Sequence, residues 1–312
     1  MKHIFNTMIF VVAVCCIASC DKNEDTVSYP SFDDFLKSKP ELSMFTQALD
    51  KAQLQTFKEG QGPFTWFAPT NDAFIAAGIT QDSLNKMTAG KTSYLLLYQL
   101  INPTSIPLIP LFTRDMIAQN SFAKTTQLGQ NIYVGNYGDS FYVNGSSIIS
   151  RDNQVSNGVV HIVNRFNVPP VLKGNIQNLL GATGQHTLFI AALTKASRWT
   201  ALGTTAVFTV LAPTDAAMTA AGYTSASINT STVGRMDSLV RYHMFSNSRM
   251  FTNDLGNKTT PGTMLGTTKT IVASNIGKKF KGLSNATPVD AIVSDMLGTN
   301  GVVHSINGVL KY

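Results

Sequence analysis

Cysteine and histidine, the residue types that most often perform chemistry in proteins, are scarce in this 312-residue chain. All three cysteines lie within the first 20 residues, as Cys15, Cys16 and Cys20. The rest of the sequence therefore has no thiol for a disulfide, a zinc site or a cysteine nucleophile. Four histidines follow, and they are His161, His186, His243 and His304. Because no two of them lie within one helical turn, their spacing predicts no metal site.

Two of these histidines occur in matching surroundings. His161 and His304 each alternate with apolar neighbours in a segment that has the pattern of a β-strand. This pattern predicts a buried imidazole that is hydrogen-bonded across its domain. The alternative interpretation is a catalytic base.

Sequence motifs for catalysis or nucleotide binding are incomplete or missing. Gly90-Lys91-Thr92 resembles the end of a phosphate-binding loop, but Asn85 stands where the motif requires its first glycine. The sequence contains no G-x-S-x-G and no G-x-G-x-x-G motif, and no pair of acids for glycoside hydrolysis repeats along it. We therefore expect no catalytic residues, no cofactor and no enzymatic activity.

The first 20 residues have the layout of a secretory signal peptide, in which Lys2 precedes an apolar run from Ile9 to Ile17. The sequence Ile17-Ala18-Ser19-Cys20 resembles the lipobox of bacterial lipoproteins, which are cleaved before a lipidated cysteine. The resemblance implies that Cys20 carries acyl chains such as palmitate. Several chains on one cysteine give a stable membrane anchor, whereas a single chain binds only marginally.

Residues 21–30 are polar and acidic, which predicts a short solvated tether. Their first five residues, Asp21-Lys22-Asn23-Glu24-Asp25, also resemble the signal that directs some Gram-negative lipoproteins to the outer face of the outer membrane. The expected location is therefore the cell envelope, as an outer-membrane lipoprotein, with the outer surface and the periplasmic face as the two alternatives.

The composition is that of a globular chain with room for two domains. Charged residues make up 13% and hydrophobic residues 44%, and the net charge is +6. The excess positive charge is scattered except at Lys278-Lys279-Phe280-Lys281, which predicts a solvated loop, with contact to phosphates or acidic sugars as the alternative. Because no stripe of aromatic and basic residues accompanies this cluster, nucleic acid is not an expected partner.

An internal repeat divides the chain. The segment from Phe64 to Phe74 recurs in related form from Phe208 to Met218, and Asn157-Gly158-Val159-Val160-His161 recurs as Asn300-Gly301-Val302-Val303-His304. In both matches, the first segment and its repeat are separated by nearly the same number of residues. This equal spacing indicates duplication of a whole domain. Because the two prolines Pro169-Pro170 indicate a boundary, we expect one domain over residues 31–170 and a second over residues 175–312.

Within each copy, a helix-rich half precedes a strand-rich half. In copy one, Ser31 and Asp34 predict a helix start, and Thr70 predicts a second one after the strand Phe64–Phe67. The later expectations are a helix ending in Tyr94–Leu100 and strands at Ile132–Val134, Phe141–Val143 and Val159–Phe166. The predicted fold class is α+β, with helices grouped against mostly antiparallel strands.

The repeated segments resemble the two signature boxes of the fasciclin (FAS1) domain. The first box is Thr65 to Phe74 and the second is Asn157 to Asn164, and copy two keeps them in looser form. The resemblance implies a β-wedge or sandwich flanked by helices in each copy. It also implies roles in adhesion and in cell-surface or matrix interaction rather than catalysis. The structural-motif residues of the boxes are Thr70, Asn71, Asp72, His161, Thr214 and His304.

The same family has a Tyr-His pair that is proposed to take part in integrin binding in some animal members. Tyr242 and His243 occupy that position in copy two, whereas copy one has Tyr98 and Gln99. The resemblance makes Tyr242 and His243 candidate binding residues and gives copy two the larger expected share of partner binding. The alternative for Tyr98 and Tyr242 is a half-buried aromatic side chain at the end of a helix.

Two functions follow from these observations. The first is a non-enzymatic lipoprotein of the cell envelope that mediates adhesion by binding an unidentified surface protein or glycan. The second is an accessory glycan-binding component of an outer-membrane nutrient-uptake system, with tyrosines that stack on sugars. The candidate tyrosines are Tyr133, Tyr137 and Tyr142, and packing in the core or in a hairpin is the alternative for them.

Overall fold

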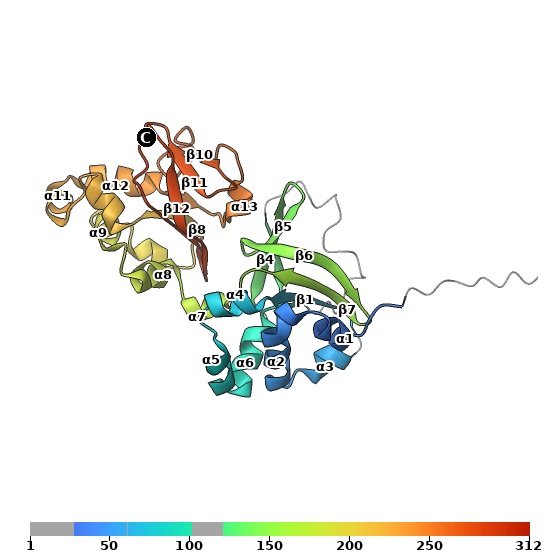
Figure 1. Cartoon of the computed structure of the whole chain (residues 1–312). Helices are drawn as coiled ribbons and strands as arrows, with labels where there is room; N and C mark the ends of the chain where they lie inside the picture. The colour runs from blue at the N-terminus through green and yellow to red at the C-terminus, as the bar shows by residue number, and fades with distance from the viewer. Residues whose placement is uncertain (1–27, 61, 102–120) are drawn as a thin grey trace, which may run out of the picture.

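The computed structural model describes residues 28–60, 62–101 and 121–312 (Figure 1). The predicted signal peptide, Cys20 and residues 21–27 of the predicted tether lie outside the described residues. Within the described ranges, no helix is both long and apolar enough to cross a membrane.

Copy one begins with helices and ends with strands. Its helices are α1 (Phe32–Lys37), η1 (Pro40–Leu42), α2 (Ser43–Lys51), α3 (Gln55–Glu59), α4 (Asn71–Ala76), α5 (Gln81–Lys86) and α6 (Ala89–Leu97). Its strands are β1 (Phe64–Pro69), β2 (Leu100–Ile101), β3 (Phe122–Thr125), β4 (Asn131–Tyr137), β5 (Ser140–Val143), β6 (Ser146–Val155) and β7 (Gly158–Val163).

Copy two repeats this order. Its helices are α7 (Pro170–Lys173), α8 (Ile176–Thr183), α9 (Thr187–Lys195), η3 (Thr200–Gly203), α10 (Asp215–Ala220), α11 (Ser225–Thr230), α12 (Val233–Tyr242) and α13 (Thr252–Leu255). Its strands are β8 (Phe208–Pro213), β9 (Met244–Ser246), β10 (Ile271–Ser274), β11 (Lys279–Gly282), β12 (Val289–Gly298) and β13 (Gly301–Ile306). In Figure 1 the two copies lie side by side and α7 joins them.

Each copy has one curled mixed sheet. The strand order is β2-β1-β7-β6-β5-β4-β3 in copy one and β10-β11-β12-β13-β8-β9 in copy two. Only the pairs β1–β7 and β8–β13 are parallel, and every other pair of named strands is antiparallel. The structure therefore confirms the α+β class with mostly antiparallel strands in two tandem copies.

The first strand of each copy lies between two cores. Trp66 and Ala68 of β1 pack with the helices, whereas Phe67 points to the opposite side and joins a second core with β4, β5 and β7. In β8, Val210 and Leu211 divide between two cores in the same way. Because successive side chains in a strand point to opposite faces, all six residues of each strand are buried.

Several predicted elements match the structure and others differ. Ser31 caps α1 and Thr70 caps α4, as predicted. The predicted helix end at Leu100 is wrong, because α6 stops at Leu97 and Leu100 pairs with Trp66 as part of β2. The expected strand Val159–Phe166 is β7, which ends at Val163.

Candidate functional site

The first signature box builds the start of a helix in both copies. Thr70 and Thr214 are N-cap residues, and the hydroxyl of each accepts a hydrogen bond at 3.2 Å, from the backbone N–H of Ala73 and of Ala217 respectively. Asp72 lies in the first turn of α4, where a carboxylate is favourable for the helix dipole. These residues therefore stabilise the fold locally and do not converge on a site.

The residue after each capping threonine ties two helices together. Asn71 accepts a hydrogen bond from the backbone N–H of Met44 at 2.9 Å, at the start of α2. Asp215 of copy two accepts the matching bond from Leu188 at 2.7 Å, at the start of α9. The side chain thus satisfies an N–H group that the helix itself leaves free.

The second signature box closes each domain around its first strand. The side-chain amide of Asn157 donates to the carbonyl of Lys58 at 2.9 Å, and that of Asn300 donates to the carbonyl of Leu202 at 2.8 Å. A Cβ at the following glycine, Gly158 or Gly301, would lie within about 2 Å of a carbonyl oxygen of β1 or β8. Only glycine permits this close approach.

His161 and His304 lie inside the two domains, with exposed fractions of 1% and 0%. The Nδ1 atom of His161 accepts the backbone N–H of Asp152 at 3.1 Å, and that of His304 accepts the N–H of Asp295 at 3.4 Å. The Nε2 atom of His304 also donates to the carbonyl of Met250 at 2.9 Å. Burial lowers the pKa of His161 to about 3, so its imidazole is neutral at pH 7. Both rings have the buried, hydrogen-bonded position that the sequence predicts.

Tyr242 and His243, the candidate binding pair, are both fully buried. The His243 Nδ1–H donates to the carbonyl of Leu239 at 2.9 Å, and Nε2 accepts the N–H of Leu310 at 3.0 Å. The Tyr242 hydroxyl donates to the carbonyl of Thr270 at 2.8 Å. This burial corrects the expectation that the pair faces a partner, because both polar groups already have partners inside the domain.

The corresponding pair of copy one serves the same internal purpose. Tyr98 is buried, and its hydroxyl donates to the carbonyl of Asn131 at 2.8 Å. Gln99 donates to the carbonyl of Leu95 at 3.3 Å, which is the helical position that His243 contacts in copy two. A histidine and a glutamine thus bind the equivalent carbonyl group at the end of the same helix. The difference between them therefore gives copy two no additional exposed binding residue.

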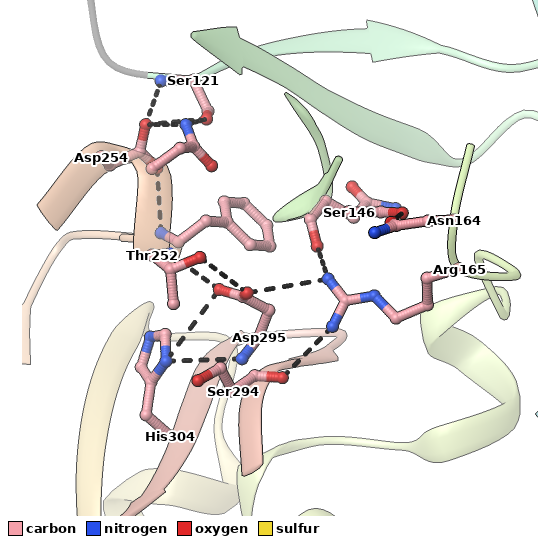
Figure 2. A network of polar contacts seen from close by, with 12 residues as sticks. Ser121, Ser146, Asn164, Arg165, Thr252, Asp254, Ser294, Asp295 and His304 are labelled. Carbon is pink, nitrogen blue, oxygen red and sulfur yellow. Dashed lines mark hydrogen bonds and ion pairs between the residues drawn. The ribbon is translucent and has the colours of Figure 1, made fainter. Parts of the chain in front are cut away.

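A separate network of polar side chains connects the two copies (Figure 2). Asp254 of α13 accepts two hydrogen bonds from Ser121, from its backbone N–H and its hydroxyl, both at 2.7 Å. Asp295 of β12 accepts the N–H and the hydroxyl of Thr252 at 2.8 and 2.9 Å, and lies 3.7 Å from the Arg165 guanidinium. Arg165 also donates to the carbonyl of Asn144 at 2.8 Å and to that of Ser294 at 3.3 Å. Two carboxylates of copy two are therefore bound by groups of copy one.

Aromatic side chains complete this contact. The rings of Tyr133 and Phe251 lie 5.6 Å apart, and the guanidinium of Arg249 lies 5.4 Å from the Tyr133 ring. Tyr137 packs so close to Gly256 that a Cβ there would be 2.6 Å from the Tyr137 ring. Tyr133 and Tyr137 therefore contact copy two, and all three candidate tyrosines, Tyr142 included, are half-buried.

Two glycines of copy one allow the domains to approach closely. A Cβ at Gly135 would lie 2.7 Å from the Asn253 amide, and a Cβ at Gly145 would lie 2.3 Å from the Asp295 carboxyl carbon. Any larger side chain at these positions must displace copy two. Burial, with the nearby Asp295 as a further cause, raises the pKa of Asp254 above its ordinary value.

This interface could not be predicted from local patterns in the sequence. Arg165 and Asp295 are far apart in the chain, and charged residues such as these usually lie on the surface. The one available signal is that the repeat breaks there, since Gly308 of copy two stands in the position of Arg165. The basic cluster at Lys278–Lys281 is not the solvated loop that the sequence predicts, because Lys279–Lys281 lie in β11, where Lys279 pairs with Asp290 and Phe280 is buried. Among the described residues, no group of three or more potential ligand side chains is placed to hold a metal ion.

Comparison with known proteins gives the family. The family model of the Fasciclin domain matches residues 40–169 and 184–312. Protein sll1483 of Synechocystis is 30% identical over 132 residues, which cover 42% of this chain and 68% of that protein. The transforming growth factor-beta-induced protein ig-h3 of Sus scrofa is 22% identical over 88% of this chain. This chain belongs to the fasciclin domain family, and both of its copies are fasciclin domains.

The match to ig-h3 spans only 37% of that protein, and a match to human periostin at 28% identity spans 16%. Among solved structures, the chain is similar to a FAS1 domain pair from the insect cell adhesion molecule fasciclin I. The TM-score is 0.40 with 18% sequence identity, and the similarity covers 90% of this chain and 96% of that chain.

Proposed function

We propose that this protein is a non-enzymatic lipoprotein of the cell envelope that mediates adhesion or surface interaction through its fasciclin domains. Fasciclin domains are known in adhesion proteins, which supports the class of function. The observation that carries the proposal further is the contact between the copies. Because Asp254 and Asp295 are bound by groups of copy one, the two domains form one unit that offers a partner a continuous surface.

The partner contacts the outside of this unit. The box residues His161 and His304 and the two tyrosines Tyr98 and Tyr242 are buried inside the domains, so they support the shape of the surface and do not touch the partner. The expectation that copy two binds more strongly therefore loses its basis in His243. We infer instead that binding requires both copies, in the relative position that their interface sets.

Adhesion by purified protein tests this function. Beads coated with the full-length protein are expected to bind cells or isolated envelopes of the source organism, and beads carrying residues 22–170 or 175–312 alone are expected to bind more weakly. Equal binding by one isolated copy would contradict the need for the pair. Failure of the intact protein to bind any envelope fraction would contradict the adhesion proposal itself.

Membrane attachment through Cys20 is the second part of the proposal, and its support is the lipobox sequence. Replacing Cys20 with Ala is expected to release the protein from the membrane fraction or to leave it unprocessed. Protease treatment of intact cells then distinguishes the outer surface from the periplasmic face. A variant that sediments with membranes as the parent does would show that Cys20 is not the anchor.

A further inference from the structure

A cleft of about 190 Å³ lies where the two copies meet. One wall is the chain after β7, from Arg165 to Val168, and another is β12, from Val293 to Leu297. Lys173, the last residue of α7, completes it. The cleft is therefore made by both copies, with α7 at their junction, and neither copy has it alone.

Two cationic side chains line this cleft. Arg165 has a side chain that is 38% exposed, and its nearest carboxylate, Asp295, is already hydrogen-bonded to Thr252. Lys173 makes no ion pair and no side-chain hydrogen bond with the residues that the structure describes. Although Lys173 is an exposed residue, surrounding protein lowers the pKa of its ammonium, and the neighbouring Arg165 adds to that effect. Because both cations line the same cleft, an anion bound there would relieve their repulsion.

A buried amide provides a second, independent observation. Asn167 lines the same cleft and is 4% exposed. Its backbone carbonyl accepts a hydrogen bond from Gln99, but its side-chain Nδ2 atom has no partner among the described residues. Buried donors in proteins are nearly always satisfied, so this amide is a candidate donor to an acceptor in the cleft.

The repeat shows that the fold does not require these residues. Leu310 of copy two occupies the position of Asn167, and Gly308 occupies the position of Arg165. Leu310 is buried, and its backbone N–H is bonded to His243, so a leucine is compatible with this part of the fold. The cation and the amide are thus additions of copy one at the junction.

We propose that this cleft binds an acidic sugar through its oxyanion group, a carboxylate or a phosphate. Arg165, Lys173 and Asn167 donate to the oxyanion, as charged and amide donors commonly do. The other walls are partly apolar, with Val168 and Met296, and suit the C–H face of a sugar ring. A recess between two domains admits a pendant group on a glycan more readily than the flat surface of a bilayer.

Titration of the purified full-length protein at low ionic strength tests the proposal. The probes are glucuronate and glucose 6-phosphate, with glucose and inorganic phosphate as comparisons. Replacing Lys173 with Gln or Asn167 with Leu is expected to weaken binding of the acidic sugars about tenfold or more, since each removes a donor to a charged group. Lys173→Arg is expected to retain binding. Lys278→Gln is the matched control, because it removes an exposed lysine from the rival basic cluster.

Each outcome decides between alternatives. Loss of binding in the Lys173 and Asn167 variants, with binding unchanged in Lys278→Gln, supports the cleft. Loss in Lys278→Gln alone would place the site at the basic cluster. Equal affinity for glucose would overturn the role of the oxyanion, and equal affinity for inorganic phosphate would overturn the role of the sugar. Because the titration needs no cells, its result is independent of the adhesion assay.

Discussion

Asp152 of copy one and Asp295 of copy two occupy the same position in the two domains and have different surroundings. Both have a positive φ, 57° and 59°. Each lies where the strand register is irregular, in the pairing of β6 with β7 and of β12 with β13. The backbone N–H of each donates to the Nδ1 atom of the histidine on the next strand. The Asp152 side chain is 36% exposed and lies near Arg151, whereas the Asp295 side chain is 4% exposed beneath Arg165 and Thr252.

The comparison separates what the fold needs from what the pair of domains needs. The bend of the strand and the buried histidine occur in both copies, so they belong to the domain itself. The burial of the carboxylate occurs in copy two alone, because copy one supplies Arg165 and the space at Gly145. The repeat therefore contains two equivalent aspartate positions. Only the one in copy two, Asp295, takes part in the contact between the copies.

Acid is expected to have the largest effect on this comparison. Burial lowers the pKa of His161 to about 3 and that of His243 to about 4, from 6.5. Between these values and 6.5 the unfolded chain binds more protons than the folded protein, so stability falls as the pH drops below 6.5. At pH 5 each imidazole costs about 2 kcal/mol. Copy two also contains His186, whose pKa is lowered too, and is expected to lose more stability than copy one.

Asp254 acts in the opposite sense, because a raised pKa favours its protonated form in the folded state and adds stability as the pH falls. Denaturant unfolding at pH 7 and pH 5 measures the sum. Since each copy contains one tryptophan, Trp66 or Trp199, single-tryptophan variants report on the copies separately. In copy one, which does not contain Asp254, a free energy of unfolding that does not fall between pH 7 and pH 5 would contradict a neutral, buried His161.

Removing the two matched carboxylates sharpens the comparison. Asp295→Ala leaves Thr252 and Arg165 without their acceptor, and is expected to destabilise the protein by about 3 kcal/mol. Asp152→Ala removes a partly exposed carboxylate, and is expected to cost less than about 1 kcal/mol. Equal losses in denaturant unfolding would mean that the strand geometry, and not the domain contact, determines the effect.

The paired histidines are expected to behave alike. Replacing His161 or His304 with Ala leaves a buried backbone N–H without its acceptor, which costs about 1–3 kcal/mol in either copy. Thermal unfolding of the two variants measures this loss. A variant that keeps its stability but loses envelope binding would instead identify a functional histidine.

Gly135→Ala is expected to have the smallest effect, about 1 kcal/mol, because the added methyl group must displace Ser121 and Asn253 at the interface. Gly90 of α6 has nothing within 4 Å of an added Cβ, so Gly90→Ala is the control. It is expected to stabilise the protein slightly, since alanine favours a helix. Denaturant unfolding of the two variants gives the comparison, and equal stability changes would indicate a loose interface.

Local features of the fold were predictable from the sequence, whereas contacts between the copies were not. Thr70 was identified as a helix cap because capping depends on neighbours within three residues. β6 was not predicted, because Ser146–Val155 is irregularly patterned and bends at Asp152. Tyr133 and Tyr137 alternate like residues of a half-exposed strand, and nothing nearby in the sequence indicates that α13 covers them. Such contacts depend on the relative position of whole domains.

The distance between the copies tests the central claim most directly, which is that they form one unit. Spin labels at positions 91 and 278, both exposed lysines, lie on different copies. In a variant without the three native cysteines, pulsed electron paramagnetic resonance is expected to give one narrow distance distribution, which Asp295→Ala broadens. A broad distribution in the parent protein, unchanged by Asp295→Ala, would show that the copies move independently and would contradict the account.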